Sequence, residues 1–263
     1  MLAEIILIKV ISTLLVVMGL AFIAENSSTR IAGILSGFPS GMAIVIFFLG
    51  FDNGTQFAVS SVDHTILGSL SAIVFAYIYY RVALVCQETR IWLPLLAALM
   101  AFLVSGNILI DMDLSILMQL MLAVIAIVIA ARLFKSVGDY GIKDKVALTH
   151  KVLFYRSLVA ACIVLFITGV AELIGVKWAG VLSGFPVTFA PFLLVIHSTY
   201  GNRVAFTLLK NYVFGIGASI SYAVAVLLFY PLLGIYLGTL ASLLAASLYL
   251  AVYVFLYQYW KRR

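Results

Sequence analysis

The chain has 263 residues, of which 65% are hydrophobic and only 10% charged, with a mean hydropathy of +1.21 and a formal net charge of +6. Soluble domains carry about 25% charged residues, so this composition excludes a water-soluble globular protein and predicts a polytopic membrane protein. The longest polar stretch covers only residues 134–154, which leaves no room for a soluble domain. We therefore interpret the positive charge as a topology signal and not as a nucleic-acid surface.

Nine apolar runs are long enough to cross a hydrocarbon core of about 30 Å as helices. In chain order they cover residues 2–24, 31–50, 64–85, 91–106, 115–133, 152–175, 178–198, 205–230 and 235–259. The first run has some features of a signal peptide, but Glu4 stands in the region that is positive in such peptides. We therefore expect an all-α fold of about nine transmembrane helices, the first of which is retained.

Lysine and arginine are divided unevenly between the two sets of loops that nine spans create. One set contains Arg30, Arg81, Arg90, Arg132, Lys135, Lys143, Lys145, Lys151, Arg156, Arg203, Lys210, Lys261, Arg262 and Arg263. The other set contains only Lys9 and Lys177. Because cytoplasmic loops are enriched in positive residues, we expect a multi-pass protein of the cell membrane with its N-terminus outside and its C-terminus in the cytoplasm.

One short stretch occurs twice. Residues 32–39 read AGILSGFP and residues 179–186 read AGVLSGFP, an offset of 147 residues. The same offset continues upstream without a gap, and nine of the sixteen residues 24–39 are identical to those at 171–186. Downstream, Gly54 corresponds to Gly201 and Gly68 to Gly215. An internal repeat of this kind decides the architecture of a chain.

The repeat pairs the first four spans with the last four and leaves the span at 115–133 without a counterpart. Because an odd number of helices separates the copies, they cross the membrane in opposite orientations. We therefore expect two inverted four-helix repeats, at residues 1–110 and 149–263, joined by a linker helix and a basic cytoplasmic loop at 111–148. Inverted-topology repeats are typical of secondary transporters.

Glycine and proline in the repeated stretch predict that the second and seventh spans break near their middle. A proline suits the first position of a new helix, so a half-helix would begin at each break. Both half-helices would direct unpaired amides and a positive dipole end toward the bilayer centre, which favours an anionic group. The candidate substrate-binding residues are Ser36, Gly37, Phe38, Pro39, Ser40, Ser183, Gly184, Phe185, Pro186 and Thr188.

The same stretch also has a purely structural interpretation. Gly33 and Gly37, like Gly180 and Gly184, are spaced as small residues that let membrane helices approach closely. The repeat therefore predicts either a packing seam alone or a seam that also lines a substrate pathway.

Two acids and two bases correspond across the repeat. Glu25 and Glu172 each lie five residues before a base, Arg30 or Lys177. They are candidates either for carboxylates that hold an interfacial turn or for gating and coupling charges. No Asp or Glu falls in the middle of a predicted span, which argues against a proton relay.

Other polar residues carry weaker signals. Lys9 and Arg156 also correspond, and we expect both to extend toward the headgroups and not toward a substrate. The three histidines and the cysteines Cys86 and Cys162 lack metal-ligand spacing. The sequence contains no nucleophile elbow, P-loop or zinc-protease motif. We expect no enzyme, no cofactor and no metal.

The pattern of residues 179–180 and 185–190, followed by Gly201 and Gly215, resembles the small GlpM-like membrane proteins. Members of that family are about half this length and look like a single copy of the repeat. The resemblance covers residues 1–106 and 150–260, and the first copy departs from it after Pro39. It implies that single-copy relatives pair as antiparallel dimers and that this chain is such a pair, fused through one extra helix.

Together these patterns predict a secondary transporter or facilitator that moves a small anionic solute or a lipid headgroup by alternating access between the repeats. The alternative is a non-transporting membrane scaffold or a lipid-handling subunit of a complex. The expected partners are the lipid bilayer and a small-molecule substrate, and a homo-oligomer is left open. The substrate and any coupling ion are not identified by these patterns.

Overall fold

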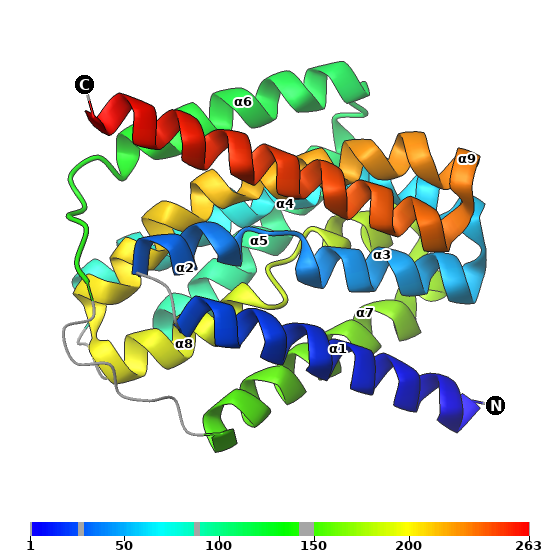
Figure 1. Cartoon of the computed structure of the whole chain (residues 1–263), viewed down its shortest axis with the longest axis horizontal. Coiled ribbons are helices and arrows are strands. Elements are labelled where there is room, and N and C mark those ends of the chain that lie inside the picture. The colour runs from blue at the N-terminus through cyan, green and yellow to red at the C-terminus, as the bar shows by residue number, and fades with distance from the viewer. Residues whose placement is uncertain (1, 26–28, 87–89, 142–149, 263) are drawn as a thin grey trace.

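The computed structural model of the chain describes residues 2–25, 29–86, 90–141 and 150–262. These residues form helices joined by turns, without a β-strand among them (Figure 1). The helices are α1 (Leu2–Glu25), α2 (Thr29–Ser36), α3 (Ser40–Asn53), α4 (Thr55–Val85), α5 (Trp92–Asp111), α6 (Ile116–Leu133), α7 (His150–Ser183), α8 (Phe189–Tyr200) and α9 (Asn202–Arg262). The predicted all-α fold is therefore confirmed.

Six helical segments are long and apolar enough to cross a membrane. They are Thr29–Asn53, which joins α2 and α3, Thr55–Val85, Trp92–Asp111, Ile116–Leu133, Val152–Ser183 and Asn202–Leu256. Large apolar side chains also point outward: Leu117 is 68% exposed, Leu244 71% and Leu232 78%. An apolar outer surface of this kind suits hydrocarbon and not water, which indicates a helical membrane protein. The finer count of nine spans stays a prediction.

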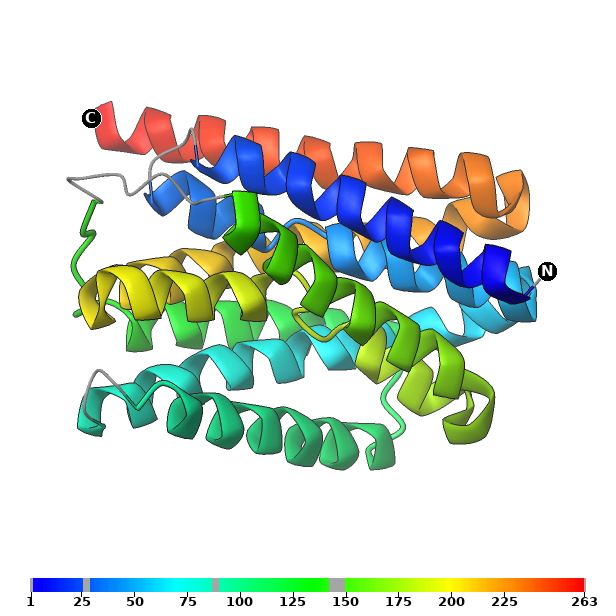
Figure 2. The same ribbon diagram turned by 90° about the horizontal axis from the view of Figure 1, so that it is seen from below.

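Two of the helices contain a sharp break at a glycine. Gly175 in α7 and Gly234 in α9 have backbone φ angles of +76° and +72°, which residues other than glycine rarely adopt. As one straight helix, the 61 residues of α9 would extend roughly 90 Å. Instead, α9 turns back on itself so that its last segment runs beside its first (Figure 1), and α7 also turns back near its C-terminal end (Figure 2).

The backbone leaves the helical path twice more, at the two copies of the repeated stretch. It does so at residues 37–39, between α2 and α3, and at residues 184–188, between α7 and α8. After each break the proline carbonyl accepts the first bond of the new helix, from the Ala43 amide to Pro39 (2.7 Å) and from the Ala190 amide to Pro186 (2.9 Å). The proline thus ends one helix and begins the next, as its missing amide requires.

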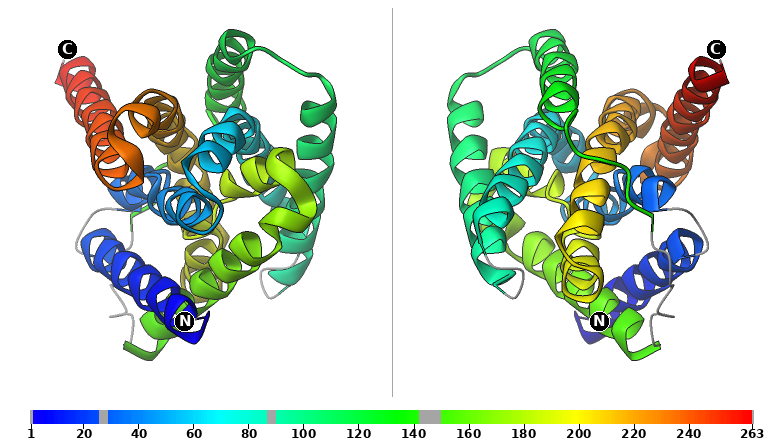
Figure 3. Two further views of the ribbon diagram at one scale, coloured as in Figure 1. Left: turned by 90° about the vertical axis from the view of Figure 1, so that its right-hand side faces the viewer. Right: turned by 90° about the vertical axis from the view of Figure 1, so that its left-hand side faces the viewer.

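The helix α4 lies at the centre of the bundle. It packs against α5, α7 and α9, whereas α2 packs against α9 and α1 against α7. Seen from either end, α1, α6 and the last segment of α9 lie at the periphery (Figure 3). The two termini lie at opposite ends of the long axis (Figure 1). The core joins both halves of the chain, with Phe75, Phe102 and Tyr222 fully buried.

The largest difference from the predicted spans is in α4, which begins at Thr55 and not at residue 64. A turn at Gly54, whose φ is +90°, ends α3 and lets α4 begin at once. Five of the nine additional residues are polar, and one of them, Ser61, donates its hydroxyl to the carbonyl of Ala58 within the helix. Hydropathy alone therefore underestimates the length of this helix.

Candidate functional site

The two helix breaks meet at the centre of the molecule and enclose a small cavity. Its volume is about 20 Å³, enough for one water molecule but not for a solute. Seven of the ten predicted substrate-binding residues line it: Ser36, Phe38, Pro39, Gly184, Phe185, Pro186 and Thr188. Tyr212 and Ser219 of α9 complete one wall, and nothing in their sequence surroundings marks them for this position. The breaks are thus closed around the site in this conformation.

A hydroxyl pair joins the two breaks directly. Ser40 Oγ and Thr188 Oγ1 lie 3.3 Å apart, although 148 positions separate them in the chain. Ser40 is 5% exposed. Each residue lies at the start of its new half-helix, so this contact joins the two half-helices at their N-terminal ends.

Four backbone amides at these helix starts have no backbone acceptor among the described residues. They are the amides of Gly41 and Met42 in the first copy and of Thr188 and Phe189 in the second. Under the offset of 147 residues, position 41 corresponds to 188 and position 42 to 189. The first amides of a helix lack an intrahelical partner and carry partial positive charge, so both sides of the cavity offer hydrogen-bond donors to an anion.

The hydroxyls of the two repeated serines, Ser36 and Ser183, bond within their own helices. Ser36 Oγ donates to the Ala32 carbonyl at 2.6 Å, and Ser183 Oγ donates to the Ala179 carbonyl at 2.7 Å. Both bonds lie within the serine's own helix, four residues back, a pattern that often bends helices. Ser183 is fully buried and does not line the cavity.

The repeated glycines form two close helix crossings. A Cβ added at Gly37 would lie 2.3 Å from the backbone of Gly215, and one at Gly184 would lie 2.5 Å from the backbone of Gly68. Neither distance is tolerable for a real Cβ, so only glycine allows these backbones to touch. Because 37 corresponds to 184 and 68 to 215, the same crossing is built twice.

The other glycine of each pattern, one turn earlier in the helix, also makes a close contact that occurs in both copies. A Cβ at Gly33 would lie 2.7 Å from the Cβ of Asn211, and one at Gly180 would lie 2.8 Å from the Cβ of His64. Positions 64 and 211 also differ by 147. Two independent pairs of contacts therefore follow the offset that the sequence repeat defines.

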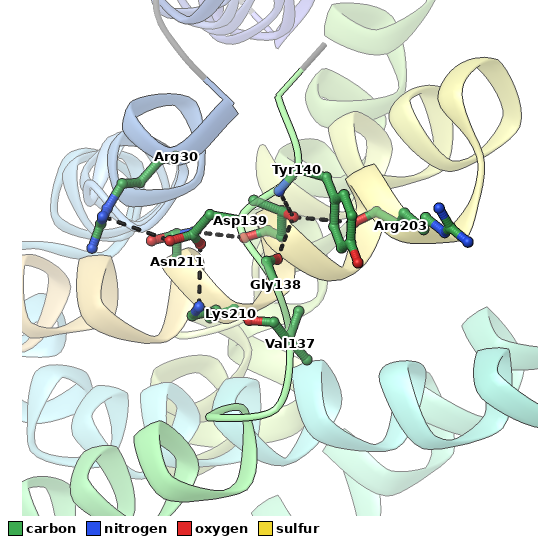
Figure 4. A network of polar contacts seen from close by, with 9 residues as sticks. Arg30, Val137, Gly138, Asp139, Tyr140, Arg203, Lys210 and Asn211 are labelled. Carbon is green, nitrogen blue, oxygen red and sulfur yellow. Dashed lines mark hydrogen bonds and ion pairs between the residues drawn. The ribbon is translucent and has the colours of Figure 1, made fainter. Parts of the chain in front are cut away.

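A polar network lies where α2, the segment after α6 and α9 meet (Figure 4). Asp139 forms ion pairs with Arg30 at 3.7 Å and with Lys210 at 3.2 Å. Lys210 also donates to the carbonyl of Val137 at 2.7 Å. These contacts hold the chain after α6 against both α2 and α9.

The next residues of that segment are also bound to α9. The Tyr140 amide donates to Thr207 Oγ1 at 2.9 Å, and this hydroxyl donates to the Gly138 carbonyl at 3.0 Å. The guanidinium of Arg203 lies 5.7 Å from the centre of the Tyr140 ring, within cation–π range (Figure 4). Lys143 and Lys145, part of the predicted basic loop that follows, lie outside the described residues.

The bases that correspond across the repeat find acids at the two ends of α6. Arg30 pairs with Asp139 after α6, and Lys177 pairs with Asp113 before it at 4.0 Å. The Lys177 pair is widely exposed, with side chains 55% and 92% accessible, so its contribution to stability is small. Glu172 is exposed, and the Glu25 side chain lies outside the described residues.

The expectation that Lys9 and Arg156 reach the headgroups is wrong. Lys9 is 7% exposed, forms an ion pair with Asp52 and donates to Thr168 Oγ1 at 3.1 Å. Arg156 is 6% exposed and places its guanidinium 4.1 Å from the centre of the Phe192 ring. Neighbouring helices cover both cations, and a helix-end carboxylate that sequence reasoning overlooked neutralises Lys9.

Among the described residues, no three His, Cys, Asp or Glu side chains gather in a way that could hold a metal ion. Comparison with known proteins adds no relative: no family model, curated protein or solved structure matches this chain. A functional interpretation therefore rests on the residues of the chain itself.

Proposed function

We propose that this protein is a secondary transporter or facilitator that moves a small anionic solute or a lipid headgroup across the membrane by alternating access. The observation that carries the proposal is the central cavity, which lies between two half-helix starts and is lined by Gly41, Met42 and Thr188, whose amides have no backbone acceptor among the described residues. Two facing positive helix ends make a site for a carboxylate or a phosphate. The solute would replace the Ser40–Thr188 contact, which closes the site in this conformation.

Inverted repeats are the second part of the proposal. The paired glycine contacts support it, because Gly37 meets Gly215 as Gly184 meets Gly68. The breaks at Gly175 and Gly234 also support it, since each divides one long element into two segments and brings the count to nine. An odd number of crossings agrees with termini at opposite ends of the molecule (Figure 1), and the charge asymmetry would place the N-terminus outside.

Alternating access would follow from rocking one repeat against the other across the two glycine crossings. Because no side chains interlock at Gly37–Gly215 and Gly184–Gly68, these crossings can act as pivots. The ion pairs of Arg30 and Lys177 lie at the ends of α6, where their exchange or release can accompany opening toward one face or the other. In this role they are gating charges and do not contact the solute.

Cysteine accessibility tests the proposal. Ser40→Cys and Thr188→Cys are placed separately in a chain that carries Cys86→Ala and Cys162→Ala, and each is treated in sealed vesicles with a membrane-impermeant thiol reagent. Because the two hydroxyls meet at one central site, we expect both cysteines to react from either face as the protein alternates, with rates that an anionic substrate changes. Ser183→Cys is the matched control, because Ser183 is buried outside the cavity and its reactivity should stay low.

If Ser40→Cys and Thr188→Cys remain unreactive from both faces, no pathway passes between the breaks and the proposal is wrong. A non-transporting subunit of a complex would show a different pattern: a stoichiometric partner on purification and no flux of any anion in liposomes. A thermal-shift screen with anions and lipid precursors supplies the substrate for both assays, since a ligand that binds only the folded protein raises its melting temperature.

A further inference from the structure

A second, much larger hollow lies beside the central cavity. It has a volume of about 340 Å³ and lies between α1, α3 and the last segment of α9. We call it the lateral groove. Its walls include Val16 of α1, Phe47 and Phe48 of α3, and Leu243 of α9. This volume falls within the range of small-molecule sites.

The lateral groove offers no unpaired polar side chain to water. Its three hydroxyls, from Ser12, Ser40 and Thr239, all have partners: Ser12 donates to the Ile8 carbonyl at 2.7 Å, Ser40 pairs with Thr188, and Thr239 donates to the Ile235 carbonyl. The remaining lining residues are apolar. Hollows without polar partners stay dry, so hydrocarbon is the occupant that fits.

The rims of the lateral groove are apolar and exposed. Two lining residues of α1 are exposed, Ile8 at 55% and Val16 at 38%, and Leu240, which follows the lining residue Thr239 on α9, is 59% exposed. In a membrane protein such side chains meet the acyl chains of the bilayer. The groove therefore opens sideways, toward lipid and not toward either aqueous face.

Phe38 joins the lateral groove to the central cavity. Its side chain lines both spaces, and Ser40 lines the groove while it contacts Thr188 of the cavity. The corresponding Phe185 is also partly exposed, but its ring packs against two others, with its centre 6.0 Å from that of Phe75 and 5.1 Å from that of Phe102. The first copy of the repeated stretch thus separates a polar cavity from an apolar groove by a single aromatic ring.

We infer that the solute is an amphiphile with one hydrocarbon chain and a small anionic head, and that it enters sideways from the bilayer. The chain occupies the lateral groove, and the head reaches the unpaired amides of Gly41, Met42 and Thr188 once Phe38 moves aside. This inference rests on the proposed function, because it names the substrate class of the same central site. A carboxylate and a phosphate monoester are the two heads that such donors recognise.

Photochemical labelling tests the inference. The protein in lipid nanodiscs is irradiated with hexadecanoic acid that carries a diazirine in its chain, and the adducts are located by peptide mass spectrometry. We expect adducts on groove residues such as Val16 and Phe47. Hexadecyl phosphate and unlabelled hexadecanoic acid, tested separately, reveal which head is preferred, and hexadecanol should compete poorly because it lacks charge.

Two pairs of variants isolate the groove from ordinary lipid contact. Val16→Trp fills the groove, whereas Leu15→Trp places the same ring on the adjacent outward face of α1. Leu243→Trp and Leu244→Trp form the equivalent pair on α9. The extra ring occupies the space of the hydrocarbon chain and should lower labelling of the groove about tenfold in Val16→Trp and Leu243→Trp, a loss of about 1.4 kcal/mol in binding free energy, with no change in the two controls. Equal labelling in both members of each pair overturns the inference.

Flux measurements separate the failure of this inference from failure of the proposed function. In proteoliposomes, Val16→Trp should slow transfer of hexadecanoate and leave cysteine accessibility at Thr188, which lines the central cavity and not the groove, unchanged in the absence of solute. If the central cysteines react from both faces and acetate is transported but hexadecanoate is not, the proposed transport function holds and the proposed amphiphilic substrate is wrong. If the central cysteines never react and no anion moves, both are wrong. A melting temperature close to the parent value shows that each variant is folded.

Discussion

The two copies of the repeated stretch have nearly the same backbone surroundings and very different side-chain surroundings. Gly37 and Gly184 make equivalent contacts, but Phe185 packs against the rings of Phe75 and Phe102 whereas Phe38 borders the lateral groove. Phe102, which covers Phe185, corresponds to Tyr249 under the offset. Tyr249 instead donates to the carbonyl of Phe214 at 3.4 Å. The hydroxyl that distinguishes Tyr249 from Phe102 thus forms a hydrogen bond with another part of α9.

This difference shows that the contacts of the repeated stretch differ in how well they tolerate substitution. A glycine crossing tolerates no added atom, because the backbones themselves touch. An aromatic contact can be replaced, since neighbouring side chains or lipid can fill the space that it leaves. The two copies of the stretch therefore keep the same glycine contacts, while one copy packs against aromatic rings and the other borders an apolar groove.

The largest effect is expected at the glycine crossings. Gly37→Leu and Gly184→Leu should each destabilise the fold by about 3 kcal/mol or more, because the new side chain overlaps the backbone of the facing helix. Thermal unfolding in detergent measures the loss. Gly169→Ala is the control, since a Cβ added at Gly169 would have no atom within 4 Å. Alanine also favours a helix over glycine by about 1 kcal/mol, so this variant should not lose stability. If only one of the two leucine variants is destabilised, the crossings are not equivalent.

The corresponding cations should differ next. Lys9→Met removes one partner of a largely buried ion pair and should cost about 3 kcal/mol, because it leaves Asp52 uncompensated. Arg156→Met removes a contact with Phe192 and should cost about 2 kcal/mol. Chemical unfolding compares the two variants. Adding Asp52→Asn to Lys9→Met should restore part of the stability, and failure to do so would show that the ion pair is not the source of the loss.

The repeated phenylalanines test the comparison directly. Phe185→Ala should cost about 3 kcal/mol, because it leaves a hole between Phe75 and Phe102. Phe38→Ala should cost about 1 kcal/mol less, since its ring already borders the lateral groove. The melting temperatures of the two variants decide this. Equal losses of stability in the two variants would mean that Phe38 is packed as closely as Phe185 and that protein side chains occupy the lateral groove.

The smallest effect is expected at the repeated serines. Ser36→Ala and Ser183→Ala should change the free energy of unfolding by less than about 0.5 kcal/mol, because each hydroxyl bonds only within its own helix. The transport rate of Ser183→Ala should stay close to the parent value, because Ser183 lies outside the central cavity that Ser36 lines. Complete loss of activity in either variant, with the fold intact, would instead assign that serine a direct role with the solute.

Much of the fold is predictable from the sequence because its signals are local. Apolar runs define the helices, and the pairs Gly37–Pro39 and Gly184–Pro186 define the breaks within about one turn. Hydropathy does not identify the start of α4, because its first turns mix polar with apolar residues. A hydropathy scale does not take account of hydroxyls that bond within their own helix. The seven cavity residues were found because they belong to a repeat and not because their chemistry is distinctive.

By itself, the sequence determined the class of protein, the helix breaks and the correspondence between the two halves. These depend on composition, on backbone preferences of single residues and on identity at a constant offset. The tertiary structure alone decided that Ser40 meets Thr188, that Lys9 is neutralised by Asp52 and that a dry groove lies beside Phe38. Such features depend on how helices far apart in the chain pack together, and no local preference encodes the volume left between them.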